Sequence, residues 1–188
     1  MLIYLAGPDV FLPDAVEIGR RKQAICARHG LIGLYPLDAE FDAAAPGLSR
    51  AIFRSNEAMM SKAQAIIANL TPFRGPSADA GTVYELGFMA GCGKLCLGYC
   101  NDPLPYTQRV AARGEVTARD GVLHDAHGHV VEDFGLADNL MIAHALDLHG
   151  CALITPQSSP DDPWHDLAAF EACVKLAAAR LPPAKLLR

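Results

Sequence analysis

Two carboxylates lie six residues apart in the middle of the chain, in the stretch NLTPFRGPSADAGTVYELGFMAG at residues 69–91. Asp79 and Glu85 flank the point where a loop rich in Pro, Gly and Ser gives way to a helix. An ionised, positioned carboxylate can attack an anomeric carbon and leave again, as in retaining glycosyl-transferring enzymes. The same acids also suit a structural role, with Asp79 as a helix cap and Glu85 near the positive helix end. On local chemistry alone both interpretations are open.

The elements that must position these acids alternate along the chain. Short apolar runs predict strands at residues 2–6, 31–35, 65–70, 95–99 and 151–155. Helical patterns fall at residues 13–29, 49–62, 81–90, 138–148 and 163–179. This alternation predicts an α/β fold, an open parallel five-stranded sheet with helices on both faces and the flavodoxin-like strand order 2-1-3-4-5. Residues 101–134 interrupt the alternation, and residues 116–131 within them predict a β-hairpin inserted at the edge of the sheet.

Length and charge set the class of protein. With 188 residues and 20.0 kDa, the chain is expected to form a single domain over residues 1–188. A net charge of -5 excludes a protein that binds nucleic acid by neutralising phosphates. Because no apolar run reaches about 18 residues, we expect no membrane span. The first apolar run lacks a basic leader, so it predicts a strand in a cytoplasmic protein.

The cysteines and histidines do not predict a metal site. Six cysteines lie in apolar surroundings, which favours reduced and mostly buried thiols. Cys92, Cys96 and Cys100 repeat every four residues, which is not a common zinc spacing. The histidines between residues 124 and 129 fall on the predicted hairpin and suit an exposed turn. We therefore expect neither a metal nor another cofactor.

The predicted topology brings further residues to the two acids. In an open α/β sheet, ligands bind beyond the carboxyl ends of the strands, where the strand order reverses. Here that point lies between the first and third strands, so residues 7–11 should face residues 69–85. Gly7 would let the backbone approach a ligand, and Phe11 would stack on a flat ring. Asp9 and Asn69 complete the predicted pocket.

Three ordered blocks of sequence resemble the nucleoside 2-deoxyribosyltransferase family. They are LAGPDVF, ANLTPFRGPSADAGTVYELGFMAG and EDFGLADNLMI, and the resemblance covers most of the chain in the right order. The D-x-G-T-x-x-E-L-G element and the A-D-N element are specific in combination. The resemblance implies an enzyme that transfers 2-deoxyribose between nucleobases, with deoxynucleosides and free bases as its partners in base salvage.

The resemblance also implies roles for individual residues. Glu85 would attack C1′ of the deoxynucleoside and form a covalent deoxyribosyl intermediate, while Asp79 would hold the 5′-hydroxyl. Asp138 and Asn139 form the A-D-N element and would both bind substrate, with Asn139 reaching the sugar of a neighbouring subunit. This arrangement requires a homo-oligomer, at least a dimer. Gly7 would approach the 3′-hydroxyl and Phe11 the base.

One position departs from the family pattern. Where many relatives have an aspartate at the start of the third strand, this chain has Gln64, which can hydrogen-bond a base but cannot protonate it. Asp9 is the first substitute and Asp38 the second, although both also suit turns. The general acid is therefore unassigned. Arg74 could serve as a lid over the base or be an ordinary surface residue, and the sequence does not decide between these roles.

Two other functions compete with deoxyribosyl transfer. A related family hydrolyses 2′-deoxynucleoside 5′-phosphates and typically has serine where Asp79 stands. Because a carboxylate repels a phosphate but accepts a hydrogen bond from a hydroxyl, Asp79 favours nucleosides. The second alternative is a nucleoside-binding or nucleotide-binding sensor without turnover, since the fold alone implies no activity. The pair Asp79 and Glu85 argues against a sensor, which needs no nucleophile.

Overall fold

The central element is a parallel sheet of four strands. The structure is a computed structural model that describes residues 1–42 and 44–181. The strands are β1 (Leu2–Ala6), β2 (Ile32–Leu34), β3 (Ala65–Asn69) and β4 (Leu95–Tyr99). Their order, β2-β1-β3-β4, matches the first four strands of the predicted topology and confirms an α/β fold with a parallel sheet.

The segment predicted as a fifth strand, residues 151–155, does not form one. It is joined to β4 through two isolated parallel bridges, from Gly150 to Cys96 and from Ile154 to Tyr99. The bridges are three residues apart on β4 but four apart on the other segment. One extra residue therefore interrupts the ladder, much as a β-bulge does. The predicted count of five strands is not confirmed.

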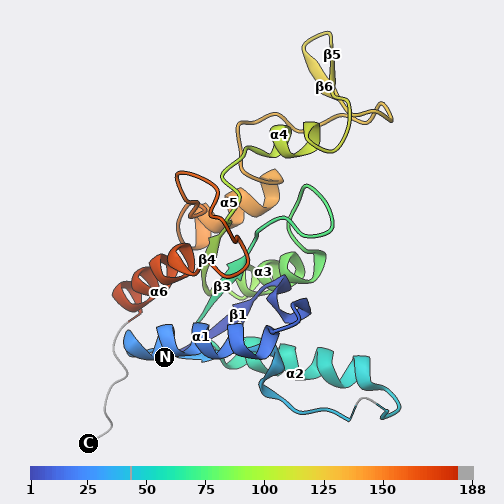
Figure 1. The fold of residues 1–188 in the computed structure, drawn as a ribbon. Coiled ribbons are helices and arrows are strands. Elements are labelled where there is room, and N and C mark those ends of the chain that lie inside the picture. The colour runs from blue at the N-terminus through green and yellow to red at the C-terminus, as the bar shows by residue number, and fades with distance from the viewer. Residues whose placement is uncertain (43, 182–188) are drawn as a thin grey trace, which may run out of the picture.

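Helices cover both faces of the sheet (Figure 1). The α-helices are α1 (Ala15–Arg28), α2 (Leu48–Lys62), α3 (Ala80–Gly91), α4 (Tyr106–Ala111), α5 (Leu140–His149) and α6 (Ala168–Arg180). Two short 3-10 turns, η1 (Pro8–Phe11) and η2 (Pro36–Asp38), follow β1 and β2. Among the described residues, no helix is both long enough and apolar enough to cross a membrane.

The alternation of side chains along β1 divides the core into two layers. Ile3 and Leu5 pack into a cluster with α1 and α6. Tyr4 and Ala6 point to the other face and pack into a cluster with residues of α2, α3 and α5. Side chains on both faces are buried, as expected for parallel strands between two layers of helices. The phenol of Tyr4 consequently lies beneath α3.

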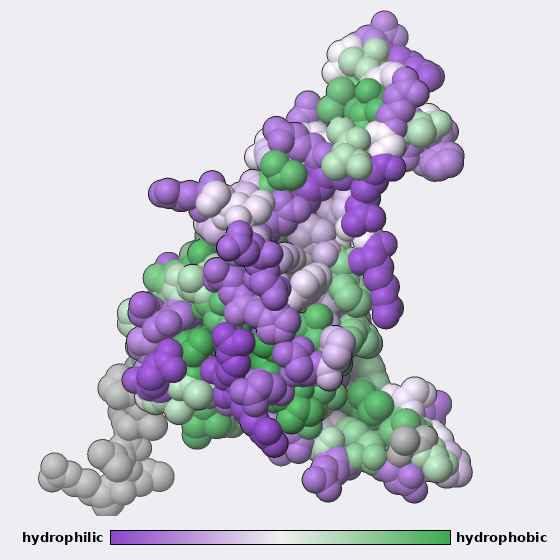
Figure 2. Space-filling model, viewed as in Figure 1, coloured by the Kyte–Doolittle hydropathy of each residue, from purple (hydrophilic) through white to green (hydrophobic). Residues whose placement is uncertain are grey.

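The inserted segment forms an arm that stands away from the rest of the molecule (Figure 1). β5 (Thr117–Arg119) and β6 (Val122–His124) pair antiparallel, which confirms the predicted hairpin. Its turn, Asp120-Gly121, has φ angles of 51° and 79°, the left-handed values that a two-residue hairpin turn requires. The hairpin forms a sheet of its own and does not pair with the central sheet. Figure 2 shows apolar surface on this arm.

Among the helix starts that differ from the predictions, those of α6 and α5 have identifiable local causes. α6 begins at Ala168, five residues after the predicted start at residue 163. The Asp162 carboxylate accepts hydrogen bonds from the backbone N–H groups of Trp164 and His165, at 3.0 and 3.2 Å. Such local bonds compete with helix formation. α5 begins at Leu140, because Asn139 is its cap.

Candidate active site

A cavity of about 310 Å³ opens where the chain leaves β1 and where α3 begins. This is the edge of the sheet at which the strand order reverses, and its size suits a small ligand. The cavity is lined by Gly7, Val10, Phe11, Pro36, Leu37, Ile52, Asn56, Asp79, Gly81, Thr82 and Glu85. The structure therefore brings together four of the predicted site residues, namely Gly7, Phe11, Asp79 and Glu85.

Glu85 is a half-buried carboxylate on α3 that is held by a phenol from the sheet. The Tyr4 hydroxyl donates a hydrogen bond to Oε1 of Glu85 over 2.5 Å. Burial raises the pKa of Glu85 to about 7, against the opposing effect of the Tyr4 bond and with a further increase from the charge of Asp79. The carboxylate therefore changes its charge near neutral pH.

Tyr4 is not among the residues predicted for the site. Burial, followed by the charge of Glu85, raises its pKa far above the usual range for a phenol. Tyr4 is thus a neutral hydrogen-bond donor at physiological pH. The alternation of side chains along residues 2–6 is the signal that could have placed it on the same face as α3.

Asp79 caps α3, as the local sequence allowed. Its Oδ2 accepts hydrogen bonds from the backbone N–H of Thr82 at 3.0 Å and from the Thr82 hydroxyl at 3.2 Å. Its Oδ1 makes no hydrogen bond with the part of the chain that the structure describes. Because Asp79 also lines the cavity, it can serve as a cap with one oxygen and accept from a ligand with the other.

Asp9 and Asn69 lie behind the cavity. Asp9 is 1% exposed, and its two oxygens accept from Lys22 Nζ at 2.5 Å and from Asn69 Nδ2 at 2.8 Å. A β-carbon at Gly7 would come within 2.3 Å of the same Asp9 carboxylate, which explains why glycine is found there. Asp9 is therefore a paired internal charge that supports the turn after β1. Lys22, its counter-ion, carried no signal in the sequence.

Asp38, the second substitute for a general acid, and Gln64 are also engaged away from the cavity. Gln64 precedes β3 and hydrogen-bonds the backbone N–H of Leu2 at 2.8 Å, so it lies at the amino end of the sheet. Asp38 accepts from the backbone N–H of Tyr35 at 2.8 Å and closes the turn η2. Neither residue lines the cavity. The acidic side chains that do line it are Asp79 and Glu85.

An aromatic stack forms one rim of the cavity. Phe11, which is 56% exposed, stacks on Phe73 with ring centroids 5.5 Å apart and an interplanar angle of 11°. The Arg74 guanidinium lies 5.1 Å from the first ring centroid and 4.6 Å from the second. Arg74 has a φ of 57°, a left-handed value that costs free energy in a residue other than glycine. The loop before Asp79 is thus folded onto Phe11.

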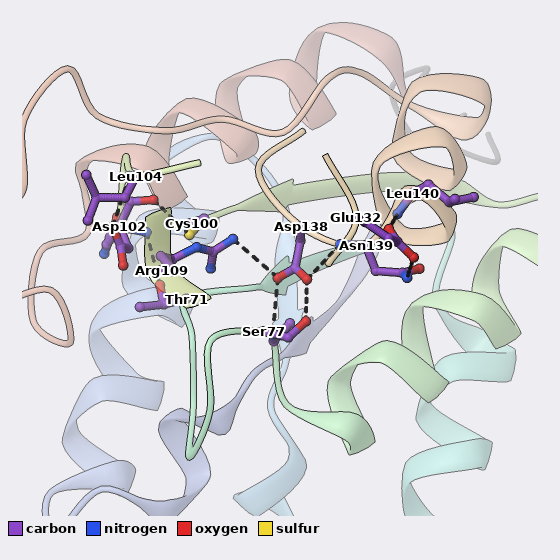
Figure 3. Close-up of polar contacts among 12 residues, drawn as sticks. Thr71, Ser77, Cys100, Asp102, Leu104, Arg109, Glu132, Asp138, Asn139 and Leu140 are labelled. Carbon is purple, nitrogen blue, oxygen red and sulfur yellow. Dashed lines mark hydrogen bonds and ion pairs between the residues drawn. The ribbon is translucent and has the colours of Figure 1, made fainter. Parts of the chain in front are cut away.

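Asp138 also holds the loop before Asp79 in place, through hydrogen bonds (Figure 3). This buried carboxylate accepts from the Ser77 hydroxyl, from the Ala78 N–H at 3.0 Å and from the Asn139 N–H at 2.8 Å. Arg109 of α4 approaches it to 3.7 Å and supplies a counter-charge. Asp138 does not line the cavity, so it holds the segment that leads into Asp79.

Asn139 lies on the opposite flank of α3 from Glu85. Its Oδ1 caps α5 by accepting from the Met141 N–H at 3.0 Å, and its Nδ2 donates to Glu132 at 2.7 Å. It lines a second cavity of about 520 Å³ between α3 and α5, whose other residues are mostly apolar. Asn139 and Glu85 therefore open onto different cavities of the same chain.

The histidines and cysteines stay outside the site. Asp125 accepts from the backbone N–H groups of His127 and His129, both at 2.9 Å, and closes a turn of the arm. Over residues 1–42 and 44–181, no three His, Cys, Asp or Glu side chains gather as metal ligands. All six cysteines are free thiols, and of the three spaced every four residues Cys92 is exposed while Cys96 and Cys100 are buried.

Comparison with known proteins identifies the family of this chain. A protein of Schizosaccharomyces pombe described as uncharacterized is 30% identical over 195 residues, which span 95% of this chain and 89% of that protein. A 2-desoxiribosyltransferase structure from Leishmania mexicana is 31% identical, with a TM-score of 0.61, over 93% of this chain and 97% of that one. A conserved protein from Enterococcus faecalis V583 shares the fold at 17% identity, with a TM-score of 0.60 over 96% and 99% of the two chains. The profile of the family named Nucleoside 2-deoxyribosyltransferase matches residues 3–141, the part of the sequence that builds the cavity, and the chain belongs to that family.

Proposed function

We propose that this protein transfers 2-deoxyribose between nucleobases by a double displacement at Glu85. Membership of the family and the similarity to the Leishmania mexicana enzyme support nucleoside deoxyribosyl transfer. The observation that carries the mechanism is the half-buried Glu85 carboxylate in a cavity of nucleoside size. Its Oε1 accepts a hydrogen bond from the Tyr4 hydroxyl over 2.5 Å. The placement of Asp79 in the same cavity supports its role as an anchor for the 5′-hydroxyl.

In the first step, Glu85 forms a bond to C1′ while the bond from C1′ to the base nitrogen breaks. The electron pair of the broken bond leaves with the base. Tyr4 donates to Oε1, which orients the carboxylate and leaves Oε2 for the attack. Because the acids that line the cavity are Asp79 and Glu85, we assign the proton for the departing base to water.

In the second step, a nitrogen of the incoming base forms a bond to C1′ and gives up its proton to water, and the Glu85 carboxylate leaves. Each displacement inverts C1′, so the product keeps the configuration of the substrate. The apolar residues beside the acids, Phe11, Leu37 and Ile52, supply surfaces on which a flat base can pack. Water competes with the incoming base for the same intermediate, and hydrolysis is the alternative outcome.

We further propose a homo-oligomer in which Asn139 reaches the sugar bound by a partner subunit. Two features support this arrangement. Asn139 lies on the flank of α3 away from its own Glu85, and it borders a mostly apolar cavity. Met141, two residues further on, is 71% exposed, as expected for a side chain that a second copy covers.

Replacing the nucleophile should abolish transfer. We expect wild-type protein, given deoxyadenosine and hypoxanthine, to produce deoxyinosine, and we expect ribonucleosides to react far more slowly. Glu85→Gln should lower this exchange by several orders of magnitude, because the amide cannot take the place of the attacking carboxylate. Chromatography of the bases and nucleosides measures both rates.

The exposed Glu115 on the arm offers a matched control, since Glu115→Gln should exchange at the wild-type rate. Normal turnover by Glu85→Gln would rule out the assigned nucleophile. Release of free deoxyribose alone, despite excess acceptor base, would establish a hydrolase instead.

The raised pKa of Glu85 predicts a pH-dependent stability. The carboxyl ionises near 4.5 when unfolded and at about 7 when folded, so its contribution to the free energy of unfolding is lost as pH rises between these values. Above pH 7 the wild-type protein buries the charge of Glu85, whereas Glu85→Gln has no charge at this position. The variant should therefore gain on the order of 3 kcal/mol relative to wild type between pH 4.5 and pH 8.

Urea unfolding at several pH values measures this difference, with Glu115→Gln again as the control. An identical pH dependence for wild type and Glu85→Gln would show that Glu85 ionises normally. The same titration should govern activity, because kcat/KM should rise with pH up to about 7 and then level off.

The shared site predicts complementation between two inactive variants. Glu85→Ala and Asn139→Ala should each be inactive alone. After subunit exchange, a mixed oligomer contains some sites with an intact Glu85 from one chain and an intact Asn139 from the other. Activity should then reappear at a fraction of the wild-type level. If differently tagged subunits are seen to exchange and no activity returns, Asn139 does not act across an interface.

A further inference from the structure

Arg109 is a buried arginine whose guanidinium nitrogens have no hydrogen-bond acceptor in the described part of the chain. Its side chain is 4% exposed, and Nε, Nη1 and Nη2 are all unpaired. Asp138 supplies a counter-charge, but its Oδ2 lies 3.7 Å from Nη2, which is too far for a hydrogen bond (Figure 3). The oxygens of Asp138 accept instead from Ser77, Ala78 and Asn139. Because buried guanidinium N–H groups are normally paired, Arg109 has donors to offer a further anion.

Arg109 lines a cavity of about 300 Å³, and a second arginine, Arg113, lines the same cavity. The Arg113 N–H donates to the Val110 carbonyl at 3.0 Å, so the last turn of α4 continues to Arg113. A spacing of four residues then places both arginines on one side of the helix. The cavity also has one carboxylate, Asp102, whose Oδ1 accepts from the Leu104 N–H at 3.0 Å. The lining side chains therefore carry two positive charges and one negative charge.

Two guanidinium groups on one cavity suit a phosphate group. A phosphate group presents three terminal oxygens in different directions, so it can accept hydrogen bonds from two guanidinium groups at once. A carboxylate is planar and is typically bound along one edge by a single arginine. A phosphate monoester also carries close to two negative charges at pH 7, which matches the excess of positive charge in this cavity.

An adjoining cavity of about 320 Å³ offers a surface for a flat ring. The two cavities share four lining residues, namely Pro72, Asp102, Leu104 and Arg113. Trp164 lines the second cavity and is half-buried, with its ring in edge contact with Phe73 at 5.9 Å between centroids. Tryptophan rings stack on nucleobases of any sequence. The space beside the two arginines is therefore larger than a phosphate ion needs and has a place for a base.

These cavities are separate from the one that contains Glu85. Neither of them shares a lining residue with it. They lie beyond the carboxyl ends of β3 and β4, since Thr71 and Asn101 each follow one of these strands by two residues. This is the edge at which open α/β sheets bind ligands.

We propose that Arg109 and Arg113 bind the phosphate group of a nucleotide whose base packs on Trp164. The nucleotide would contact Pro72, Gly75 and Pro76, which belong to the loop before Asp79. The site binds its ligand without chemical change. It does not depend on deoxyribosyl transfer, because its residues are not those of the proposed reaction.

Calorimetric titration of 2′-deoxyadenosine 5′-monophosphate at constant ionic strength measures the binding. We expect wild-type protein to bind with a Kd below about 1 mM. Arg109→Gln should raise the Kd at least about tenfold and Arg113→Gln at least about threefold, because each variant loses charge-assisted hydrogen bonds. The fluorescence of Trp164, the only tryptophan of the chain, should be quenched by the nucleotide.

Arg119→Gln is the matched control, because Arg119 is an exposed arginine on the arm. Its Kd should stay within about twofold of wild type, as expected for a surface substitution away from the site. Arg113 is also exposed, so Arg113→Gln tests the site even if the buried Arg109→Gln does not fold. No binding by wild-type protein, or the same Kd for wild type and Arg113→Gln, would overturn the proposal.

Two competing ligands test the nature and the place of the site. Inorganic phosphate should bind with a Kd at least about tenfold higher than the nucleotide, because it lacks the stacked base. Equal affinities would assign the site to free phosphate and contradict a nucleotide. Excess deoxyadenosine should not displace the nucleotide from Glu85→Gln. Displacement would place the nucleotide in the cavity that contains residue 85 and would overturn a separate site.

Discussion

The contact on which the site depends is the 2.5 Å hydrogen bond between the Tyr4 hydroxyl and the Glu85 carboxylate. It exists because a fully buried parallel sheet sends alternate side chains of β1 to opposite faces, and Tyr4 points toward α3. Burial keeps the carboxylate only partly solvated and raises its pKa to about 7. A weakly hydrated, oriented carboxylate is the form of the group best prepared to attack a sugar carbon.

Two buried ion pairs hold the loops that surround this contact. Asp9 and Lys22 brace the turn after β1, and Asp138 with Arg109 braces the loop that ends at Asp79. Removing one member of such a pair leaves an uncompensated charge, so these residues support the site although they do not line the cavity that contains Glu85. The inserted segment, which carries Arg109, is thereby connected to the loop that ends at Asp79.

The sequence predicted the parallel sheet, the hairpin and four residues of the cavity, because apolar periodicity and turn formation depend on residues that are close together in the sequence. Asp9 was predicted to bind the ligand or to act as the general acid. Its burial instead depends on Lys22, which lies thirteen residues further along the chain on α1. Tyr4 gave no motif, since its position beside Glu85 arises from a tertiary contact with α3. The prediction of a fifth strand failed because one extra residue interrupts the pairing of that segment with β4. A pattern of apolar residues does not reveal such an interruption.

The most direct test of the central claim is to isolate the covalent intermediate. Wild-type protein mixed with a deoxynucleoside and no acceptor base is quenched within the first turnovers, digested and examined by mass spectrometry. We predict one added deoxyribosyl group on the peptide that contains Glu85, and its loss when an acceptor base is supplied before quenching. A deoxyribosyl group on another residue, or rapid transfer with no adduct at any time, would contradict the account.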